Sequence, residues 1–324
     1  MSKDANHRGG IWAITAFFNP ARYRSRRNNY RVFRERLNLP LLAVELSFNG
    51  QFELTTDEAE ILIRKSGGDV MWQKERLLNI AVENLPADCH TVVWLDSDIV
   101  FQRRDWIDEA CRKLDHYKLV QPFSHVHLLP NGIGIEQWTG YQGGHVRPSV
   151  ARLIEEGMTV EECLGNPTAQ YPSMRTPGHA WVARRELLAQ YRFYDACIIG
   201  GGDTALVCAA YGMWSLLPKL HCENESAFRH YLRWAESFHQ SVQGKVSLVE
   251  GEMLHLWHGE FNDRRTRQRH HGLTAFQYDP AVDISVGDNG CWRWNSDKWA
   301  MHEYVTDYFF ARNEDGLLSS AATV

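Results

Sequence analysis

Two carboxylates, Asp96 and Asp98, stand one residue apart directly after an apolar run. The run 91–95 (TVVWL) is short and rich in β-branched and aromatic residues, which predicts a buried strand. Unpaired charges are costly inside a strand, so the two acids are expected at its end, on the rim of a sheet where ligands bind. Oxygen ligands there suit Mn²⁺ or Mg²⁺ bridging phosphate oxygens. The competing interpretation is a turn or helix cap, because Asp-Ser-Asp is ordinary turn chemistry.

The segments around this motif predict the sheet that positions it. Strands are expected at 11–18 and 41–48, ending at Asn19-Pro20 and Asn49-Gly50, and a helix is expected at 72–84, where apolar residues recur at helical spacing. Strands that alternate with helices predict an α/β fold with a mostly parallel, doubly wound sheet. We expect one catalytic domain over 1–324, with a nucleotide-sugar-binding half at 11–123 and an acceptor-binding half at 124–324 that completes the metal site.

This layout, with Asp-x-Asp at a strand exit, resembles nucleotide-sugar glycosyltransferases of the GT-A (Rossmann-like) fold. Asn79-Ile80-Ala81 lies where their Asn-x-Gly/Ala helix pattern falls. A second block narrows the resemblance to the galactosyltransferase C-terminal and polypeptide N-acetylgalactosaminyltransferase group: residues 177–188 (PGHAWVARRELL), then 193–195 (FYD), then 200–203 (GGGD). The group has two consecutive acids after the glycines, whereas this chain has Asp203 followed by Thr204.

A third block, residues 253–260 (MLHLWHGE), contains two candidate histidine ligands and is followed by several arginines. In the same families a histidine after a late strand completes the metal site. His258 falls at the expected strand exit and is preferred, with His255 as second choice. For any single histidine the alternative is a polar core residue. The arginines after His258, like those after the first strand, are expected mainly on solvated helix faces, and those nearest the strand exits are candidates to hold a diphosphate.

The resemblance implies metal-assisted transfer of a sugar from a nucleotide sugar, with a UDP-sugar as the expected donor. Asp98 and His258 would hold the cation, while Asp96 assists or contacts the ribose or sugar. Asp203 would be the catalytic base, and displacement with a single base implies inversion; its alternative role is a helix N-cap after a glycine turn. The expected donor-binding residues are Asp96, Phe17, Asn19, Arg22, Arg76 and Asn79.

The acceptor is the least defined partner. The segment 124–175 is rich in glycine, proline and aromatic residues, and aromatic rings can stack on sugars or bases; ordinary packing under a long loop is the equal alternative. The expected acceptor region comprises Trp138, Tyr141 and Trp181. A glycan and a hydroxymethylated pyrimidine base in DNA are held as equal acceptor candidates, with a protein side chain ranked lower. DNA is included because compact transferases of phage origin modify such bases.

Bulk properties indicate a globular enzyme in a reducing compartment. The chain has 324 residues, of which 44% are hydrophobic, and its net charge of −5 argues against a strongly basic nucleic-acid binder. Its 7 cysteines are scattered, and no apolar stretch is long enough to span a membrane, so a cytoplasmic location in a bacterium or virus-infected cell is expected. The sequence leaves the transferred sugar and the oligomeric state open.

Two alternative functions remain. Sugar nucleotidyltransferases are built on similar sheets but carry a glycine-rich basic loop after the first strand, where this chain has Phe-Phe-Asn-Pro at 17–20. An inactive carbohydrate-binding relative is the second alternative, and the joint presence of Asp96, Asp98, Asp203 and His258 argues against it.

Overall fold

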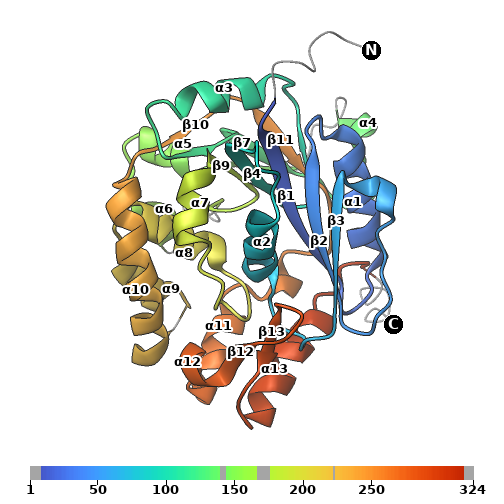
Figure 1. Ribbon diagram of the computed structural model, residues 1–324, viewed down its shortest axis with the longest axis vertical. Coiled ribbons are helices and arrows are strands. Elements are labelled where there is room, and N and C mark those ends of the chain that lie inside the picture. The colour runs from blue at the N-terminus through green and yellow to red at the C-terminus, as the bar shows by residue number, and fades with distance from the viewer. Residues whose placement is uncertain (1–8, 139–143, 166–175, 222, 317–324) are drawn as a thin grey trace.

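The computed structural model describes residues 9–138, 144–165, 176–221 and 223–316. A twisted seven-stranded sheet forms its centre and is flanked by helices (Figure 1). In spatial order the strands are β10 (Val246–Leu248), β6 (Leu119–Gln121), β9 (Ala180–Arg184), β4 (Thr91–Leu95), β1 (Ile11–Phe18), β2 (Leu41–Ser47) and β3 (Ile61–Ser66). All neighbouring strands are parallel except where β9 runs antiparallel to both β4 and β6. The expected α/β fold with a mostly parallel sheet flanked by helices is confirmed.

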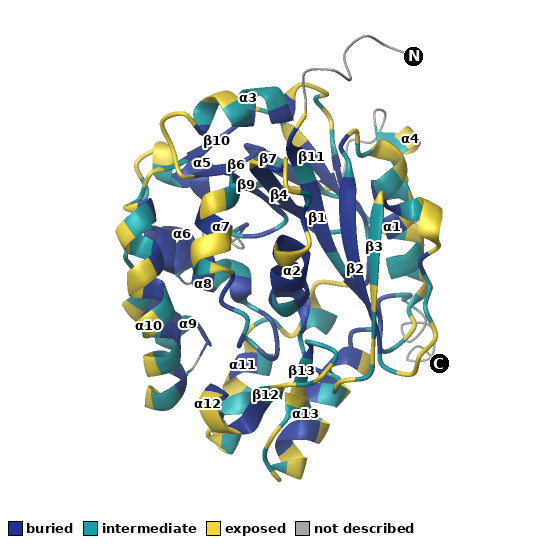
Figure 2. Cartoon of the chain, viewed as in Figure 1, coloured by how far each residue is buried: buried dark blue, intermediate teal, exposed yellow. Residues whose placement is uncertain are grey.

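The central strands are buried on both faces, which explains their continuous apolar runs (Figure 2). Along β1, Ile14 and Phe18 join one hydrophobic cluster, while Ala13 and Phe17 join another. Helix α2 (Lys74–Glu83) belongs to the first cluster and packs against β1 and β2. Helices α1 (Arg24–Arg36) and α3 (Trp106–Lys113) contribute their buried side chains to the second.

A smaller four-stranded sheet lies beside the central one and was not separately expected. Its strands, in spatial order, are β5 (Ile99–Phe101), β11 (Glu252–His255), β7 (His125–Leu128) and β8 (His145–Pro148). Strand β5 follows β4 after three residues, so Asp96 and Asp98 lie in the connection between the two sheets. Strand β11 ends at His255, so His258 lies beyond the strand.

The remaining elements cover the sheets and close the lower end of the molecule as drawn (Figure 1). The helices are α4 (Ile135–Trp138), α5 (Val150–Glu155), α6 (Val160–Leu164), α7 (Arg185–Tyr191), α8 (Gly202–Ala210), α9 (Leu217–His221), α10 (Glu225–Val242), α11 (Gln268–Leu273), α12 (Pro280–Asp283) and α13 (Trp299–Phe310). A hairpin of β12 (Ile284–Val286) and β13 (Trp292–Trp294) accompanies the last two helices. Within the described residues, no helix combines the length and apolar character that crossing a membrane requires.

The expected element boundaries agree closely with the structure. The first strand is observed as expected, the second ends one residue early at Ser47, and the helix expected at 72–84 is observed as Lys74–Glu83. Strands from both expected halves of the chain pair in the same central sheet, since β9 lies between β4 and β6. The larger hydrophobic cluster also contains residues of both halves.

Candidate active site

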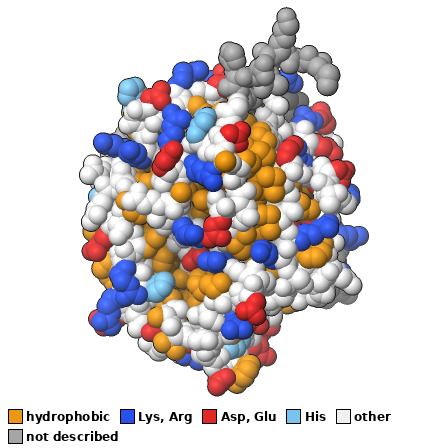
Figure 3. Space-filling view, in the orientation of Figure 1, with side chains coloured by type: hydrophobic (Ala, Val, Ile, Leu, Met, Phe, Trp, Pro, Cys, Tyr) orange, Lys and Arg blue, Asp and Glu red, His pale blue; other side chains and the backbone are white. Residues whose placement is uncertain are grey.

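The carboxyl ends of β1 and β4, and the segment after β11, open into one cavity of about 700 Å³. Its lining includes Phe17, Asp96, Asp98, Asp203, His255 and His258, which are expected site residues from four separate parts of the sequence. On the face drawn in Figure 3, acidic and basic side chains are interspersed around exposed hydrophobic groups, without a large area of one charge. The cavity therefore brings the three sequence blocks together.

Backbone hydrogen bonds fix the acidic turn against two other segments. The Asp96 amide donates to the carbonyl of His179 at 2.8 Å, and the Leu256 amide donates to the carbonyl of Asp98 at 2.8 Å. The first bond ties the turn to the segment before β9, and the second ties it to the segment after β11. The positions of both carboxylates are thus set by the sheets and not by a mobile loop.

Asp98 lies between the two candidate histidines. Its Oδ2 is 3.1 Å from His258 Nε2, its Oδ1 is 3.8 Å from His255 Nε2, and the two Nε2 atoms are 3.3 Å apart. Burial alone would raise the pKa of Asp98, but His255 and His258 hold that pKa well below its usual range, so the carboxylate is ionised. Both histidines therefore place a nitrogen near Asp98, and His258, the preferred ligand, is the closer of the two.

These three side chains fit a divalent cation. One carboxylate oxygen and two imidazole nitrogens lie within 4.8 Å of one another, and the Asp98 Oδ1 atom is buried without a hydrogen-bond partner. A mixed oxygen and nitrogen donor set suits Mn²⁺ better than Ca²⁺, which prefers oxygen alone. Asp96, Asp98 and His179 form a second, overlapping group of the same kind.

His179 is a site residue that the sequence analysis missed, although it lies within the quoted Pro-Gly-His segment. Its Nδ1 is 3.5 Å from Asp96 Oδ2, and its ring centroid is 4.8 Å from that of His255. The backbone φ of 73° places it in the left-handed region, which is uncommon for a residue other than glycine. Such strain is often found at functional sites and supports a role for His179 beside Asp96.

Lys74 is the second residue that the sequence analysis missed. It lies between Asp96, expected beside the metal and donor, and Asp203, the expected catalytic base. Its Nζ lies 2.6 Å from Asp96 Oδ1 and 3.0 Å from Asp203 Oδ2. Burial would raise the pKa of Asp96, but Lys74 lowers it to about 2. Burial raises the pKa of the adjacent Glu75 to about 8, so Glu75 is mostly protonated at neutral pH and adds little negative charge.

Asp203 lies in the first turn of α8. The N-cap of this helix is Gly201, so Asp203 is not the cap. Gly200 and Gly201 adopt φ values of 88° and 106°, as expected for a glycine turn. Burial raises the pKa of Asp203, and the nearby Lys74 opposes that rise without cancelling it. A raised pKa makes this carboxylate a stronger base than an exposed one.

Glu314, the third missed residue, comes from the segment after α13 and lies behind His258. Its Oε1 is 3.5 Å from His258 Nδ1, and its side chain is fully buried. Arg26 and Arg312 each bond to it at 2.5 Å. Burial would raise the pKa of Glu314, but these two arginines hold it well below its usual range. A carboxylate behind a ligating imidazole orients the ring and strengthens it as a ligand.

Four of the residues expected to bind the donor nucleotide sugar do not line the cavity. The Asn19 side-chain amide donates to the carbonyl of Tyr23, and Arg22 donates to Asn49 at the surface. Arg76 donates to the carbonyl of Gly290 and to Asp195. The Asn79 side chain accepts from the Phe193 amide and donates to the carbonyl of the same residue, so it holds the segment before Asp195 in place. These side chains are engaged in local structure, whereas Phe17 does line the cavity.

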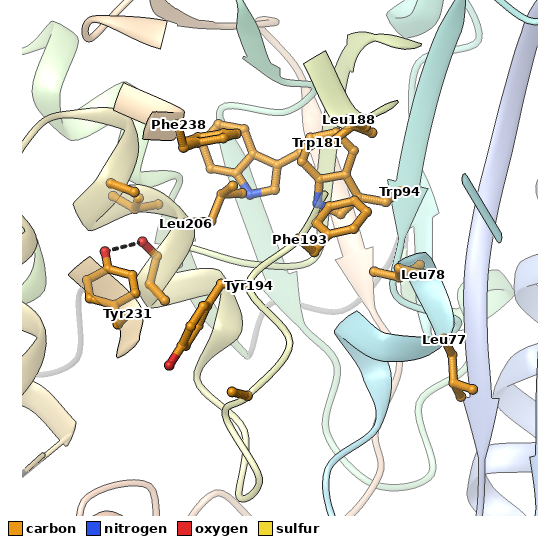
Figure 4. Close-up of a cluster of buried hydrophobic side chains, with 14 of the residues drawn as sticks. Leu77, Leu78, Trp94, Trp181, Leu188, Phe193, Tyr194, Leu206, Tyr231 and Phe238 are labelled. Carbon is orange, nitrogen blue, oxygen red and sulfur yellow. Dashed lines mark hydrogen bonds between the residues drawn. The ribbon is translucent and has the colours of Figure 1, made fainter. Parts of the chain in front are cut away.

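The expected acceptor residues do not gather at the cavity. Trp138 packs against His127, with 4.6 Å between ring centroids, and Tyr141 lies outside the described residues. Trp181 is 1% exposed and lies within the hydrophobic cluster of Figure 4. Its position on β9, between β4 and β6, covers it on both sides, so it serves the core. Helices α6 and α9 instead contribute to the cavity lining, through Glu161, Glu162, Leu220 and His221.

Both arginine-rich stretches contribute to the cavity, although Arg22 and Arg24, the members nearest the exit of the first strand, do not line it. Arg26, Arg264, Arg267 and Arg269 line it, joined by Arg312 from the C-terminal segment. Arg24 and Arg31 of α1 are largely exposed, as expected of a solvated helix face.

Comparisons with known proteins give only distant similarities to solved structures. No family model and no curated protein matches the sequence. A mannosyltransferase from Pyrobaculum calidifontis, solved with GDP-Man and Mn²⁺, is 12% identical with a TM-score of 0.42, covering 98% of this chain and 77% of that chain. A Drosophila β1,4-galactosyltransferase 7 variant, solved with manganese, UDP-Gal and xylobiose, is 9% identical with a TM-score of 0.41, covering 91% and 98%.

A third solved structure, the 4-diphosphocytidyl-2C-methyl-D-erythritol synthase of Anaerococcus prevotii, is 12% identical with a TM-score of 0.34, covering 75% and 87%. At these scores the similarities carry no argument about activity.

Proposed function

We propose that the protein is a metal-dependent glycosyltransferase that moves a sugar from a nucleotide sugar to an acceptor hydroxyl. The observation that carries this proposal is the convergence of Asp98, His255 and His258 with Asp96 and Asp203 in one cavity. A metal-binding group alone would fit many functions. A separate, partly buried carboxylate, Asp203, with a raised pKa is held beside that group by Lys74 and adds a base for glycosyl transfer.

The cation would be held by Asp98, His255 and His258, with Asp96 and His179 beside them. When bound, a divalent cation supplies positive charge that stabilises a departing nucleoside diphosphate. We favour Mn²⁺ because two of the three donors are imidazoles, with Mg²⁺ as the alternative. Glu314 lies on the Nδ1 side of the His258 ring, and the Nε2 atom of that ring faces Asp98.

Asp203 would accept the proton of the attacking hydroxyl, and its raised pKa suits that role. Lys74 holds this carboxylate and Asp96 at a fixed separation, because it contacts both. A single base on the acceptor side predicts direct displacement with inversion at the anomeric carbon. The donor nucleotide would lie along Phe17 and the cavity arginines, and a UDP-sugar is the proposed donor.

Glu161 and Glu162 line the cavity together with six arginines. Because side chains of both charges are present, a glycan and a hydroxymethylated pyrimidine in DNA both remain acceptor candidates. All six described cysteines are free, and we retain the cytoplasm as the proposed location.

The test is incubation with Mn²⁺ and a panel of nucleotide sugars, with simple glycans and with DNA containing hydroxymethylcytosine or hydroxymethyluracil as acceptors. Release of nucleoside diphosphate with a hexose-sized mass gain on an acceptor is the expected result. Pyrophosphate-dependent chemistry would instead identify a sugar nucleotidyltransferase. Binding of carbohydrate without turnover of any donor would identify an inactive carbohydrate-binding relative.

A further inference from the structure

Most of the cationic side chains described above have an acid or hydroxyl partner inside the protein. Arg26 and Arg312 pair with Glu314, and Lys74 pairs with Asp96 and Asp203. These contacts neutralise the charges in place. They leave such cations with limited capacity to bind a further anion.

Arg147, on β8, differs from these cations. It lines the same cavity, its Nε is buried without a hydrogen-bond partner, and burial lowers its pKa. Across the described ranges, which omit 139–143 and 166–175, no carboxylate lies within 4.0 Å of its guanidinium nitrogens. Its recorded contact is with the ring of Phe261, whose centroid is 4.8 Å from the Arg147 Cζ atom. Stacking on a ring holds a guanidinium in place but does not neutralise its charge.

Arg264 provides a second such charge close by. The short helix η4 (Asn262–Arg264) follows Phe261 directly, so the ring that holds Arg147 and the Arg264 side chain belong to one turn. Arg264 Nη2 lies 3.1 Å from His258 Nε2, its Nε is buried without a partner, and no ion pair joins it to a described carboxylate. Two guanidinium groups without carboxylate partners thus face one cavity beside the proposed metal ligands.

We propose that Arg147 and Arg264 form a subsite for a phosphate-class oxyanion, with Phe261 holding Arg147 in position. A phosphate monoester carries about −1.5 to −2 charges at neutral pH, which matches two guanidinium groups, whereas a carboxylate would leave one positive charge unbalanced. Guanidinium also presents paired N–H donors that match phosphate oxygens. The subsite deepens the proposed function by requiring a phosphorylated ligand, and its phosphate belongs either to the donor diphosphate or to a phosphorylated acceptor.

The experiment measures binding by calorimetry, with full-length protein and chelator present so that metal binding does not contribute. The probes are inorganic phosphate, a hexose phosphate and UDP. The Arg147→Gln variant should bind phosphate and hexose phosphate at least tenfold more weakly, because it loses charge-assisted hydrogen bonds. The matched control is Arg229→Gln, which removes one positive charge from the exposed face of α10 and should leave binding unchanged.

UDP identifies the source of the phosphate. An equal loss of UDP affinity in Arg147→Gln assigns the subsite to the donor, while unchanged UDP binding with weakened hexose phosphate binding assigns it to the acceptor. Unchanged binding of all three probes would overturn the proposal. If Arg147→Gln does not fold, Arg147→Lys serves instead, and the loss of the planar fork should still weaken phosphate binding severalfold.

The experiment distinguishes a failure of the phosphate subsite from a failure of the proposed glycosyltransferase function. Phosphate binding that depends on Arg147, in a protein that turns over no nucleotide sugar, would support the subsite and refute glycosyl transfer. Turnover of a nucleotide sugar at the wild-type rate by Arg147→Gln, together with unchanged phosphate binding, would refute the subsite and leave glycosyl transfer standing.

Discussion

Substituting Gly178 by alanine should move the proposed catalytic base without altering its chemistry. A Cβ atom built on Gly178 would lie 2.6 Å from Asp203 Oδ2 and 2.9 Å from its Cγ. Ordinary contact begins at 3.4 Å, so the carboxylate must move by about 0.8 Å. Gly178 does not have a positive φ, so alanine fits its backbone and the strain falls on the side-chain contact.

A displacement of this size is large for a catalytic group. A misplacement of about 1 Å typically costs on the order of a hundredfold in rate, so we expect the turnover number of Gly178→Ala to fall by roughly that factor. The movement would also lengthen the 3.0 Å contact between Asp203 and Lys74. Donor affinity should change little, because the base acts on the acceptor hydroxyl.

The assay is nucleoside diphosphate release under saturating donor and acceptor, with the donor dissociation constant measured separately. Asp203→Asn is the reference variant, because it removes the carboxylate base without displacing the side chain. It should lower the turnover number at least as much as Gly178→Ala does. Wild-type turnover in Gly178→Ala, alongside an inactive Asp203→Asn, would show that the position of the carboxylate is not critical. Loss of donor affinity in both variants would place Asp203 on the donor side.

Three further predictions concern the metal group and its support. Asp98→Asn should abolish Mn²⁺-dependent turnover while the circular dichroism spectrum stays unchanged, since the residue lies at a rim; retained turnover would refute the metal assignment. His258→Ala should weaken Mn²⁺ binding in calorimetry more than His255→Ala, because His258 is closer to Asp98 and has Glu314 behind it, and the reverse order would exchange their roles. Glu314 has a lowered folded-state pKa, so it stabilises the fold fully above about pH 4.5 and loses that contribution as the pH falls further. Below that pH the stability advantage of wild type over Glu314→Gln should shrink by about 1.4 kcal/mol per pH unit in urea titrations, and a constant difference would contradict the lowered pKa.

The sequence predicted three neighbouring strands of the central sheet, β4, β1 and β2, because these strands are buried on both faces. Such strands must be continuous apolar runs, and 11–18 and 91–95 are of that kind. The rim position of Asp96 and Asp98 followed from the cost of burying charge in a strand. Composition and periodicity therefore predicted the elements and the point where the site begins.

The side chains that complete the site could not be predicted because they depend on tertiary contacts. Lys74 and Asp203 are 129 residues apart, and Arg26 and Glu314 are 288 apart. No local pattern distinguishes Lys74 from any lysine at the start of a helix. The same limit produced the errors: Asn79 matched a family pattern, yet its amide is occupied by the backbone of Phe193.

Lys74, one of the missed residues, has a physical role that explains why the site needs it. Asp96, Asp98 and Asp203 are acids around one cavity, and clustered negative charges repel each other strongly when partly removed from water. Lys74 offsets the charge of Asp96 and Asp203. His258 Nε2 lies 3.1 Å from Asp98 Oδ2, whereas burial holds the pKa of His255 well below its usual range, so that ring is neutral. The acids can therefore stay ionised and close together before any cation binds. A cation that contacts Asp96 must then compete with Lys74, so the affinity of the site for metal depends on Lys74 as well as on the residues that would hold the ion.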